Sequence, residues 1–293
     1  MAKGGSLIMK ASIIIPTKDK LSRLRLTLHA LESQVGADVE VIIVFDGCSK
    51  TTIEQFKQSS FGFQPVIVIS EHNVGRAAAR NLGLAQAKGD IVIFVDDDRV
   101  PAADFVRRHI EGHREPCVLL GKRTDVLYSE KELDHLYVLG RVRRNPDAVR
   151  ERMTKLEMYK TLPVSMKSSL RWLLFYTGNV SVDRSCLEQI GGFDTNFQGW
   201  GHEDLDLGIR LAKQGIPFRK DDAIVNYHLM HDSNFDLRQR RKESARNLAY
   251  MIRKYRKDAI VLLLAIFYVR HKLFGLRYNR QVVQEKNVLV GKS

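Results

Sequence analysis

The chain has 293 residues, of which 44% are hydrophobic and 28% are charged, and its formal net charge is +13. This length and balance are ordinary for a globular protein with a real core, and they exclude disordered and collagen-like classes. The positive charge leaves nucleic acid, an anionic membrane surface and an anionic small substrate open as partners, and a solvated basic face would explain much of it as well.

Strands and helices alternate along the first half of the sequence. Apolar runs predict buried strands over 11–15, 39–45, 65–70 and 90–95, and helical spacing of apolar residues predicts helices over 20–35, 51–58, 74–87 and 101–115. Such alternation implies right-handed βαβ units. The predicted fold class is therefore α/β, with a mostly parallel sheet flanked by helices.

The second half is less regular. We expect strands over 117–121 and 223–228, a strand-like segment over 173–182, and helices over 203–214 and from 236 onward. The basic segment 122–172 is expected to form helices and a loop inserted into the domain. The sequence thus predicts one domain over 1–236, with 122–172 as a variable basic insert, and a basic, amphipathic helical extension over 237–293.

The cysteines and the apolar segments indicate in which cellular compartment the protein is expected. Cys48, Cys117 and Cys186 are far apart and form no CxxC pair, which argues against a disulfide scaffold and a zinc knuckle. Residues 1–20 lack the architecture of a signal peptide. The most apolar window, 259–269, is shorter than the roughly 20 helical residues of a membrane span. We expect a cytoplasmic protein with reduced thiols, with peripheral association at the inner membrane face kept open.

Polar clusters follow three of the predicted parallel strands, at Pro16–Asp19, at Asp46 and Gly47, and at Asp96–Asp98. Ligands of such sheets bind beyond the carboxyl ends of the strands. Three adjacent carboxylates repel one another unless a cation offsets them, and a hard divalent ion would do so. A solvated acidic turn is the simpler explanation, but the position after a buried strand favours a metal.

Two later clusters complete the chemistry. In GWGHEDLD, Gly199 and Gly201 flank Trp200, an arrangement typical of a tight loop with an exposed aromatic face. Helix capping explains the acidic residues that follow, but it does not explain the glycines around the tryptophan. His228 and His231, after the last predicted strand, could complete an oxygen-rich metal site.

The motifs together resemble family 2 glycosyltransferases with the GT-A fold. The matching segments, in family order over about residues 11–232, are SIIIPTKD, VIIVFDGCS, NVGRAAARNLGLAQAKGDIVIFVDDD, TGNVSV, IGGFD and GWGHEDLDLGIRL, followed by the late histidine. The GGFD…GWGHEDLD arrangement resembles the galactosyltransferase-like and chondroitin-polymerase-like branch. That branch transfers hexoses or N-acetylhexosamines from UDP.

The resemblance implies roles for the matching positions. Asp204 would be the base that takes the acceptor proton, with Glu203 beside it, and Asp98 and His228 would ligate Mn²⁺ or Mg²⁺, with His231 as a competitor. The uracil and ribose would lie at Pro16, Thr17 and Asp46. The full set expected to bind the nucleotide sugar is Pro16, Thr17, Asp46, Asn73, Arg80, Asp96, Asp97, Asn179 and Trp200.

Two departures from the family pattern leave the nucleotide base open, although UDP is expected. Thr17-Lys18-Asp19 stands where the family often has an aromatic residue and an asparagine, and Phe45-Asp46 stands where it often has two aspartates. The expected reaction is an inverting, metal-assisted transfer from a UDP-sugar to a glycan, wall polymer, lipid-linked or peptide acceptor.

Other function classes fit less well. The alternatives are a non-catalytic nucleotide-sugar-binding protein and a basic protein that binds a membrane or a polyanion. No nucleic acid partner is expected, because no recognisable motif or aromatic stacking platform accompanies the basic residues. The PTKD loop after the first strand lacks the glycines of nucleotidyltransferases and of Rossmann dehydrogenases.

Overall fold

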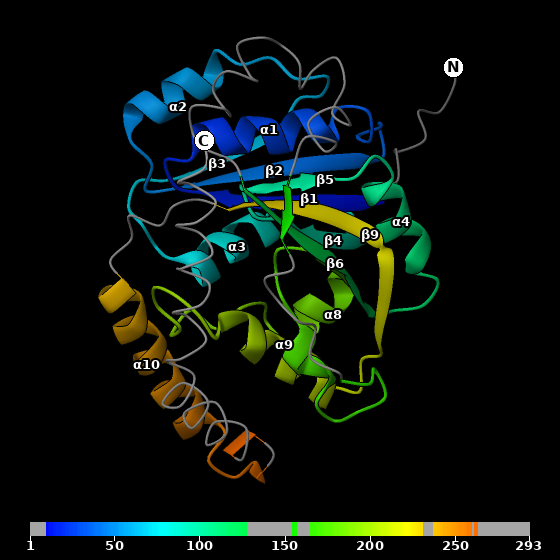
Figure 1. The fold of residues 1–293 in the computed structure, drawn as a ribbon, viewed down its shortest axis with the longest axis vertical. Coiled ribbons are helices and arrows are strands. Elements are labelled where there is room, and N and C mark those ends of the chain that lie inside the picture. Colours follow the sequence, from blue (N-terminus) through cyan, green and yellow to red (C-terminus); the bar gives the residue numbers. More distant parts are fainter. Residues whose placement is uncertain (1–9, 128–153, 157–163, 231–236, 260, 263–293) are drawn as a thin grey trace, which may run out of the picture.

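The computed structural model of the chain describes residues 10–127, 154–156, 164–230, 237–259 and 261–262. These residues form one sheet with the strand order β3-β2-β1-β4-β8-β6-β9-β5, and β7 pairs with β6 (Figure 1). The strands are β1 (Ala11–Thr17), β2 (Val39–Asp46), β3 (Val66–Ser70), β4 (Ile91–Phe94), β5 (Arg99–Pro101), β6 (Val118–Leu127), β7 (Thr154–Leu156), β8 (Val180–Asp183) and β9 (Phe218–Met230).

The predicted parallel sheet forms the N-terminal half of the molecule. β1 pairs in parallel with β2 and with β4, and β2 pairs in parallel with β3. β8 then runs antiparallel to both β4 and β6, and the second half of the sheet is mixed. The parallel half therefore brings the carboxyl ends of β1, β2 and β4 to one edge, where the sequence places its polar clusters.

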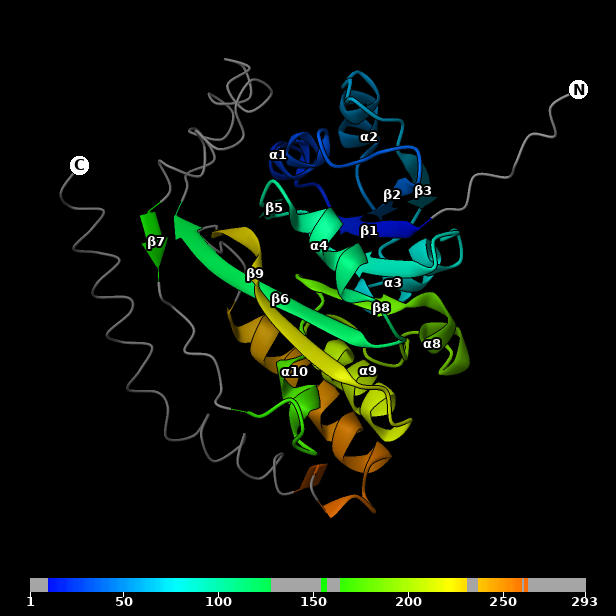
Figure 2. The ribbon, with the colours of Figure 1, turned by 90° about the vertical axis from the view of Figure 1, so that its right-hand side faces the viewer.

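Helices cover both faces of this sheet. They are α1 (Leu21–Leu31), α2 (Lys50–Lys57), α3 (Arg76–Leu84), α4 (Phe105–Gly112), α8 (Arg184–Gln189), α9 (Glu203–Lys213) and α10 (Leu237–Lys254), with a short 3₁₀ helix, η1, over Arg171–Leu174. Apolar residues of α1, α2 and α4 pack on one face, and those of α3, α8, α9 and α10 pack on the other (Figures 1 and 2). The result is three layers with a core on each side of the sheet.

The structure departs from the sequence predictions where tertiary pairing extends or creates strands. β6 continues to Leu127, into the predicted basic insert, and β9 begins at Phe218 rather than at 223, because the two strands pair in parallel along most of their length. Within 173–182 only the residues from Val180 onward form a strand. β5, β7 and α8 were not predicted, since each is too short to show a period in the sequence.

The C-terminal helix α10 joins the same core as the sheet. Leu248, Met251 and Tyr255 cluster with apolar residues of β4 and α9. The described part of the predicted extension thus packs directly on the predicted domain. Among the helices of the described residues, none combines the length and hydrophobicity of a membrane span.

The central strands should dominate the stability. Ile42 in β2 is completely buried, whereas Ile67 in neighbouring β3 is 37% exposed. Ile42→Ala should lower the free energy of unfolding by about 2–5 kcal/mol, because it removes a packed side chain and leaves a cavity. Ile67→Ala is the matched control and should cost roughly 1 kcal/mol or less. Urea unfolding measures the loss of stability in each variant. Equal losses would contradict a core that buries β2 on both faces of the sheet.

Candidate active site

The three predicted polar clusters do meet at one edge of the sheet. Thr17, the last residue of β1, donates a hydrogen bond from Oγ1 to Oδ2 of Asp97 at 2.8 Å. Both side chains are buried. Asp46 ends β2 next to this pair in the strand order, and Pro16 precedes Thr17 in β1. The edge therefore has the carboxylate-rich character that the strand ends predict.

Each of the three consecutive aspartates has its own surroundings. Asp96 is 30% exposed in its side chain and pairs with Arg80 at 3.0 Å. Asp97 accepts from Thr17 and from Lys20, and burial together with the neighbouring Asp98 raises its pKa. For Asp98 burial acts in the same upward direction, but His228 and Lys20 outweigh it and hold its pKa well below the usual range. Asp98 is therefore the most firmly ionised of the three.

His228 faces Asp98 across the edge of the sheet. β9 lies between β5 and β6, with His228 opposite Arg99 on one side and Asp125 on the other. The His228 Nδ1 atom lies 2.7 Å from Asp125 Oδ1, and Nε2 lies 3.7 Å from Asp98 Oδ1. The Arg123 guanidinium, which can only donate, also lies 2.8 Å from Nδ1, so this nitrogen faces both a carboxylate and a cation. Nε2, on the other side of the ring, faces Asp98.

The donor set suits a divalent metal. A carboxylate oxygen and an imidazole nitrogen face each other, and a second carboxylate orients the histidine, as is usual for metal-binding histidines. Asp98 and His228 would hold the ion, and a nucleotide diphosphate would supply further oxygens. A nitrogen ligand suits Mn²⁺ better than Mg²⁺. His231 lies outside the described residues.

Two cations at this edge were missed by the sequence analysis. Lys20, at the N-cap of α1, places Nζ 3.1 Å from Asp97 and 3.0 Å from Asp98. The buried Arg99 lies 3.8 Å from both Asp96 and Asp98. Without them the three carboxylates would repel one another at close range. Arg99 follows the aspartates directly, but the position of Lys20 depends on how α1 leaves β1.

Asp46 shapes the loop that carries Asn73. Its carboxylate accepts from the backbone N–H of Val74 at 2.6 Å and of Gly75 at 3.1 Å. The Asn73 side chain also accepts from Gly75, at 3.0 Å. Gly47 has a φ of +65°, and a Cβ there would lie 2.4 Å from the Asn73 backbone nitrogen, so only glycine allows this approach. Asp46 and Asn73 thus belong to one loop structure at the site.

Arg80 connects the aspartates to the GWGHED segment. Its guanidinium is buried between Asp96, at 3.0 Å, and Glu203, at 3.2 Å. Next to Glu203, at the start of α9, lies Asp204. Burial and the Glu203 carboxylate raise the pKa of Asp204 to about 7, although Arg80 opposes the shift. A partly exposed carboxylate with a pKa near neutrality has the property that a general base needs.

The GWG loop is held by α10. The Trp200 backbone N–H donates to Glu243 Oε2 at 3.0 Å, and the Asn247 side chain donates to the carbonyl oxygens of Gln198 and Gly201. A Cβ on Gly75 would lie 3.9 Å from the Gly199 nitrogen, so this loop borders the one that carries Asn73. Glu243 and Asn247 were not predicted, because they are more than forty positions along the chain from the loop that they bind.

Asn179 differs from the other predicted site residues. Its side chain is buried, Nδ2 donates to the carbonyl oxygens of Lys122 and Ile224 at 3.0 Å each, and Oδ1 lies 3.1 Å from Nε2 of His109. These contacts use both amide hydrogens and the oxygen. The structure therefore gives Asn179 the role of joining β6, β9 and α4, and the expected contact with the nucleotide sugar stays a prediction.

Comparison with known proteins agrees with this geometry. The model of Glycosyl transferase family 2 matches residues 12–167, and that of the N-terminal domain of galactosyltransferase matches 164–232. An uncharacterised glycosyltransferase of Bacillus subtilis, YfnE, is 30% identical over 84% of this chain and 71% of its own length. Validoxylamine A glucosyltransferase of Streptomyces hygroscopicus is 31% identical over 70% of this chain, and chondroitin synthase of Escherichia coli is 28% identical over 74%. The chain spans 52% of the former and 34% of the latter.

Solved structures share the architecture at low sequence identity. A mannosyltransferase of Pyrobaculum calidifontis, in complex with GDP-Man and Mn²⁺, superposes with a TM-score of 0.58 at 17% identity, over 83% of this chain and 64% of that one. TarS of S. aureus gives 0.56 at 16% identity, over 83% and 44%. GalNAc-T7 with UDP, GalNAc and Mn²⁺ gives 0.56 at 13% identity, over 78% and 45%. The chain belongs to glycosyltransferase family 2, has the GT-A fold, and falls in the galactosyltransferase-like and chondroitin-polymerase-like branch.

Proposed function

We propose that this protein is an inverting glycosyltransferase that moves a hexose or N-acetylhexosamine from a UDP-sugar to an acceptor nucleophile with the help of Mn²⁺ or Mg²⁺. The observation that carries the proposal is the pair of carboxylate groups joined by Arg80. On one side lie Asp96 and Asp98 with His228, and on the other lie Glu203 and Asp204. The first group suits a metal and a diphosphate, and the second suits an acceptor hydroxyl.

The donor side is built to bind a nucleotide diphosphate. Asp98 and His228 would hold the ion, which when bound supplies Lewis-acid stabilisation of the charge on the leaving diphosphate. Asp125, 2.7 Å from Nδ1, orients the His228 ring so that Nε2 faces Asp98. Thr17, Asn73 and the loop that Asp46 anchors would bind the base and ribose. The complexes of GalNAc-T7 with UDP and of the Pyrobaculum enzyme with GDP-Man support a nucleotide-sugar donor.

The acceptor side would supply the base. Asp204 would take the proton of the acceptor hydroxyl as that oxygen attacks the anomeric carbon from the face opposite the leaving nucleotide. A pKa of about 7 lets the carboxylate be ionised at neutral pH and still accept a proton effectively. Trp200, in the neighbouring loop, offers an apolar ring to a sugar face.

The other predicted partners stay predictions. An anionic membrane surface or polyanionic acceptor at the cytoplasmic side would find exposed cations along α10, namely Arg238, Arg241, Lys242, Arg246 and Arg253. The alternative of a non-catalytic nucleotide-sugar-binding protein is disfavoured by the raised pKa of Asp204, which mere binding does not need.

Donor turnover tests the function directly. UDP release from a panel of UDP-sugars should occur slowly without acceptor, should require Mn²⁺, and should stop with EDTA. Asp125→Asn should lower metal affinity about 10–100-fold, because His228 loses its orienting partner. His228→Ala should weaken metal binding further, whereas His231→Ala is the matched control and should retain it. Metal-dependent release that needs His231 and not His228 would reassign the metal ligand.

The base assignment predicts a specific kinetic defect. Asp204→Asn should lower the transfer rate by about 10²–10⁴-fold while nucleotide binding is retained, because only the proton acceptor is removed. The wild-type rate should rise with pH up to about 7 and then level off. Asp222→Asn, at a carboxylate that is 65% exposed, is the control and should change neither property. Near-wild-type turnover of Asp204→Asn would exclude Asp204 as the base.

The same substitution should stabilise the fold. Because the folded-state pKa of Asp204 is raised, the folded protein holds a proton that the unfolded chain loses above about pH 4, and stability falls as pH rises towards 7. Asp204→Asn removes this cost. We expect a gain on the order of 1–3 kcal/mol at pH 8 and little gain at pH 4 in urea unfolding. An equal gain at both pH values would contradict the raised pKa.

A further inference from the structure

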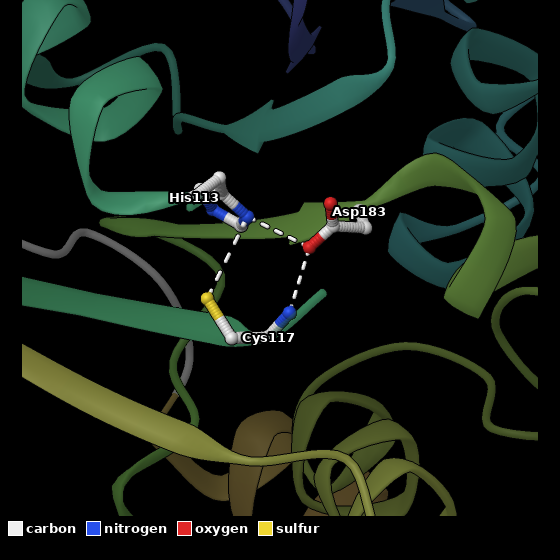
Figure 3. A group of neighbouring side chains, drawn as sticks. All are labelled: His113, Cys117 and Asp183. Atoms are coloured by element: carbon white, nitrogen blue, oxygen red, sulfur yellow. Dashed lines mark hydrogen bonds and ion pairs between the residues drawn. The ribbon is translucent and has the colours of Figure 1, made fainter. Parts of the chain in front are cut away.

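A second cluster of potential metal ligands lies at the opposite edge of the sheet from the active site. His113 follows α4, Cys117 precedes β6, and Asp183 ends β8 (Figure 3). Asp183 pairs with Ile91, the first residue of β4, whereas Asp96–Asp98 follow the last. This cluster is therefore distinct from the site formed by Asp98 and His228.

The three ligand atoms converge on one point. His113 Nδ1 lies 2.7 Å from Asp183 Oδ2 and 3.6 Å from Cys117 Sγ, and all three atoms lie within 4.8 Å of one another (Figure 3). The side chain of His113 is 1% exposed, Cys117 is completely buried, and that of Asp183 is 17% exposed. The cluster thus lies just beneath the surface, with Asp183 open to solvent.

A chain of buried hydrogen bonds leads to this cluster and fixes its protons. It starts at Asn179, whose two amide hydrogens are used by the carbonyl oxygens of Lys122 and Ile224. The Asn179 oxygen must therefore accept the Nε2 proton of His109, at 3.1 Å. Burial lowers the pKa of His109 to about 3, so this histidine is neutral and has no second proton. Its Nδ1 atom can only accept.

The next two links determine the state of His113. Ser181 Oγ, 2.8 Å from His109 Nδ1, must donate its proton to that nitrogen. The same Oγ lies 2.6 Å from His113 Nε2 and can now only accept, so Nε2 carries a proton. His113 Nδ1 then lies between the Asp183 carboxylate oxygen and the Cys117 sulfur. Three atoms of these types that converge in this way can share protons or hold a metal ion.

We propose that His113, Cys117 and Asp183 form a zinc-binding site that joins α4, β6 and β8. The donor set of imidazole nitrogen, thiolate sulfur and carboxylate oxygen is one that Zn²⁺ takes, and the Nε2–H bond to Ser181 is the outer contact that fixes a ligating histidine. On binding, the Cys117 thiol gives its proton to solvent. One thiolate and one carboxylate then balance the two charges of the ion.

The distances suit a tetrahedral ion. With typical zinc bonds of about 2.0–2.1 Å to nitrogen and about 2.3 Å to sulfur, the nitrogen–sulfur edge of a tetrahedron is about 3.6 Å. The separation of His113 Nδ1 and Cys117 Sγ is 3.6 Å. Asp183 Oδ2 would withdraw from Nδ1 by well under about 1 Å to reach the corresponding edge. A water molecule at the exposed side of Asp183 would fill the fourth position.

Cobalt substitution tests the site separately from the active site. Full-length protein, stripped of metal and titrated with Co²⁺, should show a near-ultraviolet thiolate-to-cobalt absorption band. Cys117→Ala should abolish the band. Cys186→Ala removes another buried cysteine and is the matched control, and Asp98→Ala alters only the active site. Both should keep the band.

Zinc itself provides the second readout. Purified wild-type protein should retain about one Zn²⁺ that Cys117→Ala lacks, and a zinc chelator should lower the Tm of the wild type but not that of Cys117→Ala. The absence of the band in the wild type, or its survival in Cys117→Ala, would overturn the site and leave a protonated His113 paired with Asp183. A band that disappears in Asp98→Ala would overturn it as well.

Discussion

The ion pairs of Arg80 hold the active site together. One buried guanidinium binds Asp96, which follows β4, and Glu203, which begins α9, although the two acidic residues are more than a hundred positions apart in the sequence. A buried arginine without carboxylate partners would be strongly destabilising, and so would these carboxylates without the arginine. The two halves of the site therefore form together, and the position of α9 at the sheet edge depends on this charge balance.

The same balance explains how neighbouring carboxylates acquire different properties. Asp98 is kept ionised by Lys20 and His228, which suits a metal ligand. Asp204 lies beside Glu203, whose charge is already partnered by Arg80, so burial and repulsion prevail and its pKa rises. The raised pKa of Asp204 costs stability at neutral pH, and such a cost is common at residues of active sites. The GWG loop, which is hydrogen-bonded to α10, fixes the position of Asp204.

The opposite edge of the sheet is held by hydrogen bonds between buried polar side chains. There, Asn179, which precedes β8, and Ser181 and Asp183 of β8 form a continuous polar chain with His109 and His113. Buried polar networks of this kind are costly unless every member has a partner. Each member up to His113 has a hydrogen-bond partner, and the chain ends at the cluster of His113, Cys117 and Asp183 for which we propose a zinc ion. The sequence shows no CxxC pair and gave no sign of this cluster, because its three side chains come from three separate parts of the chain.

The sequence by itself determined the strands and helices of the parallel half, the edge of the sheet at which the polar clusters meet, and the family. These features depend on local patterns, namely apolar periodicity, strand ends and contiguous motifs such as Asp96–Asp98 and GWGHEDLD. Only the tertiary structure decided that Lys20 and Arg99 offset the aspartates, that Asp125 orients His228, that α10 holds the backbone of Trp200, and that Asn179 joins β6 to β9. These contacts join residues that are far apart in the chain. The residues become buried only when the sheet and helices pack, and that burial determines their pKa values and their hydrogen-bond partners.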